Sequence, residues 1–221
     1  MDAGVIASVI AATLNAGTPL LIAAIGILIH EKSGVLNLGV EGMMLMGAVT
    51  GFGVTYATGS FALGFLAGAL AGLVMAALFG FFTLGLYANQ YAAGLALSLF
   101  GAGLSAFVGQ PLQGMALPSR APTGIPGLES IPFLGDAFFS SHCLVYLSLI
   151  GLAAVGWFLY KSRSGLMLRA VGESPSSAYA LGYNVRVIRF WAVLFGGFMS
   201  GLAGAYLSLV YTPLWAEGMT A

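Results

Sequence analysis

Six long runs of apolar residues constrain the fold of this chain more than any other feature. They lie at about 3–29, 43–57, 61–87, 91–108, 143–160 and 190–211. Only 6% of the 221 residues are charged, whereas soluble domains carry about 25%, so the chain has too few charges for a soluble surface. In lipid, backbone N–H and C=O groups must be paired inside the protein, which helices achieve within one segment. The sequence therefore predicts an all-α polytopic transmembrane bundle of about six spans, forming one domain over 1–221.

The few charges are distributed unevenly, and their distribution predicts an orientation. Residues 161–189 carry five basic residues and one acid, net +4, and the remainder carries two basic residues and six acids, net −4. Because cytoplasmic loops of membrane proteins are enriched in Lys and Arg, we expect 161–189 in the cytoplasm. The N-terminus and the loop 109–141 then face outward, and 30–42 and 88–90 face inward or dip into the membrane. The asymmetry indicates orientation and gives no sign of a nucleic-acid partner.

The expected outward loop, 109–141, differs from the rest of the chain in composition. It has no apolar run of span length, and loops longer than about 15 residues are usually functional or disordered. It contains five of the eight prolines, namely Pro111, Pro118, Pro122, Pro126 and Pro132.

The basic segment contains a short helix whose two ends are marked in the sequence. Ser174 is a good N-cap, Pro175 suits the first helical position, and Gly182 suits the position just past the end. About seven helical residues are too few for stability alone in water, so the segment is typical of a helix that docks onto a partner. The alternative is a solvated loop whose charges only set topology.

A glycine-spaced stretch, 34–42, is the best candidate for a substrate path. Asn37 and Glu41 are four residues apart and would share one face of a helix, and Gly39 between them allows the backbone to unwind. Transporters place binding sites at glycine-interrupted helices with one or two polar side chains. The alternative is a plain cytoplasmic turn. Asn89 and Gln90 form a second interruption, which is either a further part of such a site or a loop.

Signatures of catalysis and of metal binding are absent from the sequence. The only lysines are Lys32 and Lys161, and neither lies in a GxxxxGK(S/T) nucleotide-binding loop. His30 and His142 are far apart, and Cys143 is the only cysteine. No span carries a series of acids or histidines that could relay protons. Transport driven by energy from another protein remains as the function class, with no cofactor or metal bound by this chain.

Small residues recur at a spacing of four within three of the expected spans. This pattern lets helix backbones approach closely in a bilayer and predicts a compact bundle. The residues are Gly64, Gly68 and Gly72, then Gly94, Ser98 and Ala102, and then Gly197, Gly201 and Ala205.

Three blocks of the sequence resemble one family. They read EKSGVLNLGVEGMMLMGA (31–48), ANQYAAGLALSLFGAGLSAFVG (88–109) and LMLRAVGESPSSAYALGYNV (166–185). In this order they resemble the permease subunits of bacterial ABC importers of the branched-chain amino acid, ribose and nucleoside group. The resemblance is closest to the nucleoside and simple-sugar branch, whose first block typically reads E-(R/K)-S-G-V-x-N-(I/L)-G-x-E-G-M-M.

The resemblance implies a set of partners and a role for each block. A separate ATPase subunit would use the ATP and receive the helix at 174–182, so this chain would itself be no enzyme. A second permease subunit would complete the pathway, and an extracytoplasmic solute-binding protein would face the loop 109–141. All would meet at the inner membrane of a bacterium, among its lipids. The coupling residues would be Arg169, Gly172, Glu173, Ser174, Pro175 and Gly182, with Arg169 and Glu173 forming charge pairs.

The resemblance also implies that Asn37 and Glu41 lie near the translocation path, in a broken helix within the membrane and not in an inward loop. Members of the family usually continue for roughly two more spans, so we expect this chain to be truncated at its C-terminus. The expected substrate is a nucleoside or a simple sugar. The alternatives are a branched-chain amino acid permease, a stand-alone carrier or channel, and a scaffold subunit that does not transport.

Overall fold

The computed structural model describes residues 3–117 and 142–220, and their backbone is mostly helical. The long helices are α1 (Ala3–Lys32), α2 (Val40–Thr58), α3 (Phe61–Gly80), α4 (Gln90–Gly109), α5 (Cys143–Lys161) and α8 (Val185–Tyr206). Two short helices, α6 (Arg163–Glu173) and α7 (Pro175–Ala180), lie between α5 and α8. The π-helical turns η1 (Phe81–Gly85) and η4 (Leu207–Tyr211) extend α3 and α8, and the 3-10 turn η2 (Gln110–Leu112) follows α4. The predicted all-α bundle is confirmed for the described residues.

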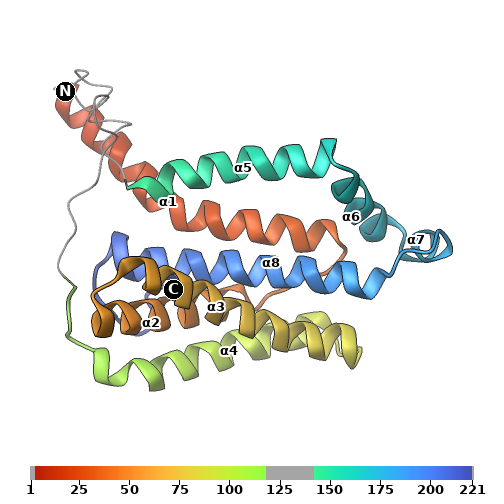
Figure 1. Ribbon diagram of the computed structural model, residues 1–221. Helices are drawn as coiled ribbons and strands as arrows, with labels where there is room; N and C mark the ends of the chain where they lie inside the picture. The colour runs from red at the N-terminus through yellow and green to blue at the C-terminus, as the bar shows by residue number, and fades with distance from the viewer. Residues whose placement is uncertain (1–2, 118–141, 221) are drawn as a thin grey trace.

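Helix α8 is the centre of the bundle. It packs most extensively against α3, α2 and α1, while α5 covers α1 and α4 covers α2. Figure 1 shows this arrangement as a stack, with α5 at one edge, then α1, α8, α2 together with α3, and α4 at the other edge. The apolar contacts fall into several clusters along the stack, because each pair of neighbouring helices buries its own strip of side chains.

The central contact between α3 and α8 is made by the small residues that the sequence pattern predicted. A methyl group on Gly72 would overlap the carbonyl oxygen of Gly197, and one on Gly68 would come within 2.6 Å of Ala205 Cβ. Helix α2 joins the same contact, because a methyl on Gly47 would overlap the backbone of Gly201. The backbones therefore touch, which gives packing contacts that larger side chains would prevent.

Within residues 3–117 and 142–220, five helices are long and apolar enough to cross a membrane, whereas the sequence predicted about six spans. The five segments are Ser8–Lys32, Phe61–Gly85, Gln90–Leu112, Cys143–Lys161 and Val185–Tyr211. The remaining expected span, 43–57, lies within α2, which does not meet this criterion and is enclosed by α3, α4 and α8, so that it faces protein more than lipid. The last expected span also begins earlier than predicted, at Val185, so its first turns carry Arg186 and Arg189.

The expected loop 161–189 contains more helix than predicted. The sequence marked only α7, but 163–173 forms α6, which buries Gly165, Leu168 and Val171 on one side. Its apolar positions recur every three residues among polar and charged ones, so hydropathy alone predicts a polar loop. Figure 1 shows α6 and α7 at one end of the bundle, together with the ends of α1, α3 and α5.

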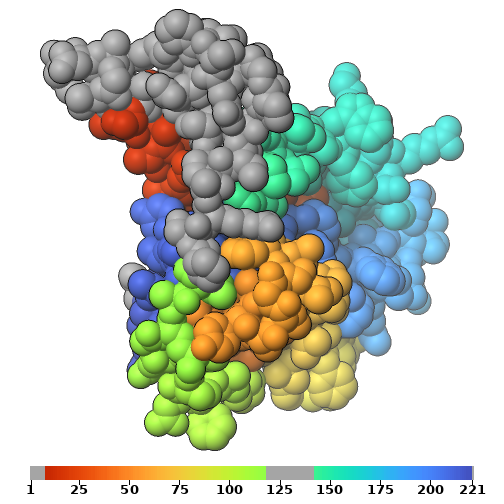
Figure 2. Space-filling model, turned by 60° about the vertical axis from the view of Figure 1, so that its left-hand side comes forward, coloured from red at the N-terminus to blue at the C-terminus, as the bar shows by residue number. Residues whose placement is uncertain are grey.

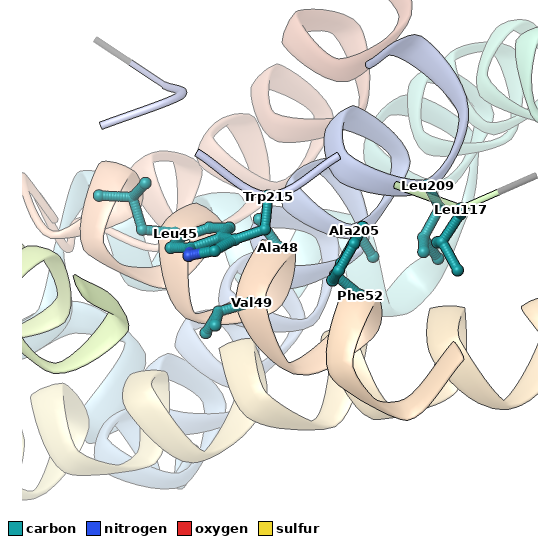
Figure 3. Close-up of a cluster of buried hydrophobic side chains, with 8 residues drawn as sticks. All are labelled: Leu45, Ala48, Val49, Phe52, Leu117, Ala205, Leu209 and Trp215. Carbon is teal, nitrogen blue, oxygen red and sulfur yellow. The ribbon is translucent and has the colours of Figure 1, made fainter. Parts of the chain in front are cut away.

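The opposite end of the bundle is closed by the residues that follow α8. Leu117 N donates to Pro213 O at 3.0 Å, and Ala116 pairs with Leu214 in an isolated antiparallel bridge. Trp215 is buried against Leu45 and Val49 of α2, as Figure 3 shows. In Figure 2 the α2–α3 corner (orange) lies beside the end of α4 (green) on this face. Of the expected outward loop 109–141, the part from 118 onwards lies outside the described residues.

Candidate functional site

The candidate substrate-path stretch is an interruption between α1 and α2. Helix α1 ends at Lys32 and α2 begins at Val40, and between them the chain is non-helical. Burial alternates along the interruption, because Ser33, Val35 and Asn37 are at most 7% exposed while the residues between them are exposed. One face of the segment 33–39 is therefore packed into the bundle, which favours the broken-helix interpretation over a solvated turn.

Asn37 organises the entry into α2. Its Oδ1 accepts a hydrogen bond from Gly39 N at 2.8 Å, and its Nδ2 lies 3.8 Å from the sulfur of Met43. Gly39 is packed so that a methyl group would lie 3.0 Å from Leu97 Cδ2 and 3.2 Å from the carbonyl oxygen of Gly94, both in α4. The amide of Asn37 thus closes a local turn against α4, and this turn aims the first residues of α2.

Asn37 and Glu41 would share one face only if the segment were helical, and the structure does not meet this condition. Asn37 precedes the helix, whereas Glu41 is in the first turn of α2 and is exposed. The reason is that the chain is non-helical from 33 to 39 and turns at Gly39, so the four-residue spacing no longer places both side chains on one side.

The two residues of the second interruption have different positions. Gln90 Oε1 accepts a hydrogen bond from Leu36 N at 2.9 Å, so Gln90 is joined to the segment 33–39 across 54 residues of sequence. Asn89 instead caps α4, because its Oδ1 accepts from Tyr91 N at 2.9 Å and from Ala92 N at 3.2 Å. The structure brings Asn37, Gly39 and Gln90 to one region, and uses the Asn89 oxygen for local helix capping.

The predicted short helix is present with the predicted ends. Ser174 Oγ accepts from Ser177 N, Pro175 is the first residue of α7, and Gly182 has φ +88°, a conformation that L residues rarely adopt. Helix α7 has six residues, and most of its side chains are exposed. A small capped helix therefore projects from the bundle with little packing of its own, as Figure 1 shows.

The other residues of the predicted coupling set lie on α6. Arg169 places its guanidinium carbon 4.9 Å from the centre of the Tyr160 ring of α5, so its charge is held against an aromatic face of the same chain. Glu173 is exposed at the end of α6. Gly172 packs against the end of α1, and a methyl group there would overlap the carbonyl oxygen of Lys32. The predicted charge pairs of Arg169 and Glu173 with a partner remain a prediction.

The sequence reading missed a polar groove next to α7. It encloses about 980 Å³, and its lining includes Tyr87, Tyr179 and Arg186. Tyr87 adopts φ +56°, and the guanidinium carbon of Arg186 lies 5.0 Å from its ring centre, so the α3–α4 corner reaches the start of α8. An isolated tyrosine in a non-helical link gives no sequence signal for such a contact.

A second missed feature is a polar contact inside the bundle. Tyr206 of α8 is completely buried, and its hydroxyl donates to Asn15 Oδ1 of α1 at 3.1 Å. The ring of His142 meets Tyr206 edge-on, with 6.3 Å between ring centres. Polar groups within a span are by default functional candidates. The sequence signal is Asn15 itself, a polar residue in the middle of the first apolar run, to which the sequence analysis assigned no role.

The candidate positions carry amide and hydroxyl groups, and the described part of the chain holds no group of histidine, cysteine or acidic residues arranged for a metal ion. Amides, tyrosine hydroxyls and freed backbone groups form hydrogen bonds with polar solutes.

Comparisons with known proteins agree in indicating one class. The sequence profile of the family described as "Branched-chain amino acid transport system / permease component" matches residues 9–221. The chain is 43% identical, over 97% of its length, to a putative glucose ABC transporter permease protein of Haloferax volcanii. It is 34% identical over 90% of its length to a guanosine ABC transporter permease protein of Bacillus subtilis, and 35% identical over 89% to a nucleoside ABC transporter permease protein of Lactococcus lactis.

The chain spans 66% of the length of each of these relatives. No solved structure is significantly similar to it.

Proposed function

The chain belongs to the permease family of branched-chain amino acid transport systems, and from this premise we propose that it is a membrane-spanning subunit of an ATP-driven importer. The apolar helices and the family make it a multi-pass membrane protein. The observation that carries the proposal is α7, a capped and exposed helix. It lies at the end of the bundle where the segment 161–189 gathers five of the seven basic residues. A two-turn helix of this kind is suited to docking, because it cannot be stable without neighbours.

The proposed partners follow from this role. A separate ATPase subunit receives α7 and hydrolyses ATP, so this chain needs no cofactor of its own. A second permease subunit and an extracytoplasmic solute-binding protein complete the importer. The complex lies in a bacterial inner membrane, with lipid around the apolar helices and no role for nucleic acid.

The proposed solute is a simple sugar or a nucleoside. Relatives named for glucose, guanosine and nucleosides support this class. Both kinds of solute carry several hydroxyl groups, which amides such as those of Asn37 and Gln90 can bind. A branched-chain amino acid is the second candidate, and the description of the family favours it.

In the proposed mechanism, closure of the ATPase dimer displaces α7, and the bundle changes between outward and inward access. Segment 33–39 lines the path, because it is a non-helical link between two helices and one of its faces is packed into the bundle.

The test is ATP hydrolysis and uptake by the complete transporter in lipid vesicles, with glucose, guanosine and leucine as probes. We expect one probe to raise ATP hydrolysis and to be taken up only with ATP. Glu173→Ala combined with Gly182→Pro should abolish the stimulation, because proline removes the N–H that Gly182 donates to Tyr179 O at the end of α7. The variant must still insert into the membrane. Uptake without ATP would favour a stand-alone carrier, and complex formation without any stimulation would favour a scaffold subunit.

A further inference from the structure

One arginine joins three chain segments at the end of the bundle that bears α6 and α7. Arg189, in the second turn of α8, donates from Nε to the carbonyl oxygen of Ser33 at 3.0 Å. Its Nη2 also reaches the carbonyl oxygen of Val171, in the last turn of α6, at 3.5 Å. Ser33 is completely buried and is the first residue after α1. Both acceptors are main-chain carbonyl groups, so Arg189 contacts the backbone of both segments directly.

Two glycines bring the same segments into direct backbone contact. A methyl group on Gly34 would lie 2.9 Å from Arg189 Nη2 and 3.2 Å from Gly172 Cα. Gly172 faces Lys32 equally closely, because a methyl group there would overlap the carbonyl oxygen of Lys32 and lie 3.2 Å from Gly34 N. No side chain separates the end of α6 from the end of α1, so the two backbones are in direct contact there.

The contact of Arg189 connects helices α6 and α7 with the segment 33–39. The residue after α6, Ser174, donates its N–H to Ala170 O at 3.0 Å and caps α7 with its side chain, so α6 and α7 are tied together. On the other side, Ser33 begins the segment 33–39, which contains Asn37. Arg189 therefore stands between the helix proposed to dock onto the ATPase and the segment proposed to line the path.

We propose that Arg189 is a positioning residue that transmits the displacement of α6 and α7 to segment 33–39. The inference rests on the proposed function and adds a route for the movement. A guanidinium suits this role, since its planar set of donors reaches two carbonyl oxygens in a defined geometry, whereas a lysine ammonium acts as a single point charge.

The first test compares Arg189→Gln and Arg189→Lys with the wild type in the complete transporter. The readout is the number of ATP molecules hydrolysed per molecule of guanosine or glucose taken up. We expect this ratio to rise about tenfold in Arg189→Gln, with ATP hydrolysis within about twofold of wild type and Arg189→Lys intermediate. Gly172→Ala should raise the ratio as well, because the added methyl separates α6 from the end of α1.

Two matched variants control for loss of charge and for the added methyl. Arg163→Gln removes an exposed charge from the first turn of α6, and Gly156→Ala adds a methyl on α5 where nothing lies within 4 Å. Both should keep the wild-type ratio. A merely structural role for Arg189 would lower hydrolysis and uptake together and leave the ratio unchanged, which would overturn the proposal. Absence of ATP-dependent uptake in the wild type would instead refute the proposed function itself.

A second readout measures movement without transport. Spin labels on Leu36→Cys and Gly103→Cys, both exposed, report the position of the segment relative to α4 in a Cys143→Ser background. We expect Mg-ATP to shift this distance in the wild-type complex and to leave it unchanged in Arg189→Gln. An equal shift in both proteins, or no shift in the wild type, would overturn the proposal.

Discussion

Glycines on α2, α3 and α8 are the residues that set the distances between these helices. Gly201 is the centre of this contact, because a methyl group on it would lie 2.9 Å from Gly72 Cα and would overlap the carbonyl oxygen of Gly68. By contrast, Gly103 on α4 has nothing within 4 Å of the same position. Glycines of similar sequence context thus have different roles, and only those at a backbone contact resist substitution.

This difference predicts opposite effects of one substitution at two sites. Gly201→Ala should destabilise the protein by about 1–3 kcal/mol, the usual cost of overpacking a close contact. Gly103→Ala should be neutral or stabilise it by up to about 1 kcal/mol, since alanine favours helix. Thermal unfolding in detergent measures both. Equal midpoints for the two variants would contradict the close α3–α8 contact.

At the scale of elements, α7 and segment 33–39 are held by caps and side-chain hydrogen bonds more than by regular helix packing. Helix α7 depends on its caps, because only Ala178 of its six residues is buried. Segment 33–39 depends on side chains from other elements, namely Gln90 from the start of α4 and Arg189 from α8. Helix α7 is able to move, since few buried contacts oppose a local change there.

The dependence of α7 on its N-cap can be tested directly. Ser174→Ala removes the oxygen that accepts from Ser177 N and should cost about 1 kcal/mol locally, which corresponds to about fivefold faster amide hydrogen exchange in α7. The global unfolding midpoint should not change, because α7 contributes little to the core. Ser176→Ala removes a hydroxyl from the same turn without removing a cap and serves as the control. Equal exchange in the two variants would show that the cap does not stabilise α7.

At the scale of the whole molecule, the bundle has two chemically different ends. One end carries α6, α7 and the arginines of 161–189, and the other carries the α2–α3 corner, the start of α5 and the buried tail around Trp215 (Figure 1). Such a polarity suits a protein that meets a different partner on each side of a membrane. The excess of positive charge predicts that the end with α7 faces the cytoplasm.

Labelling from the two sides tests this orientation. Cys143 is exposed at the start of α5, and a membrane-impermeant maleimide should modify it in right-side-out vesicles. Ser176→Cys in a Cys143→Ser background should react only after the vesicles are opened. Cys143→Ser alone gives the background signal. Reaction of both cysteines from the same side would contradict the placement of positions 143 and 176 at opposite ends of the bundle. A reversed pattern would contradict the predicted orientation.

Much of the helical architecture could be predicted from the sequence, because its signals are local. Apolar runs, the cap of Ser174 and the left-handed glycine at Gly182 each act within a few residues. Helix α6 was missed because its apolar positions alternate with charges over a short stretch. The candidate site was predicted less completely. Gly39 is hydrogen-bonded to Asn37 and Gln90 to the neighbouring Leu36, while Glu41 is exposed in the first turn of α2.

The sequence by itself determined the membrane-spanning class, the position of the basic segment along the chain and the two ends of α7. Hydropathy, charge and capping are properties of one continuous stretch of sequence. Only the tertiary structure decided which residues meet across the bundle, such as Arg189 with Ser33 and Tyr206 with Asn15. These pairs are separated by 156 and 191 residues. They depend on which helix faces touch, and small residues on several helices would allow many alternative pairings that the sequence pattern does not distinguish.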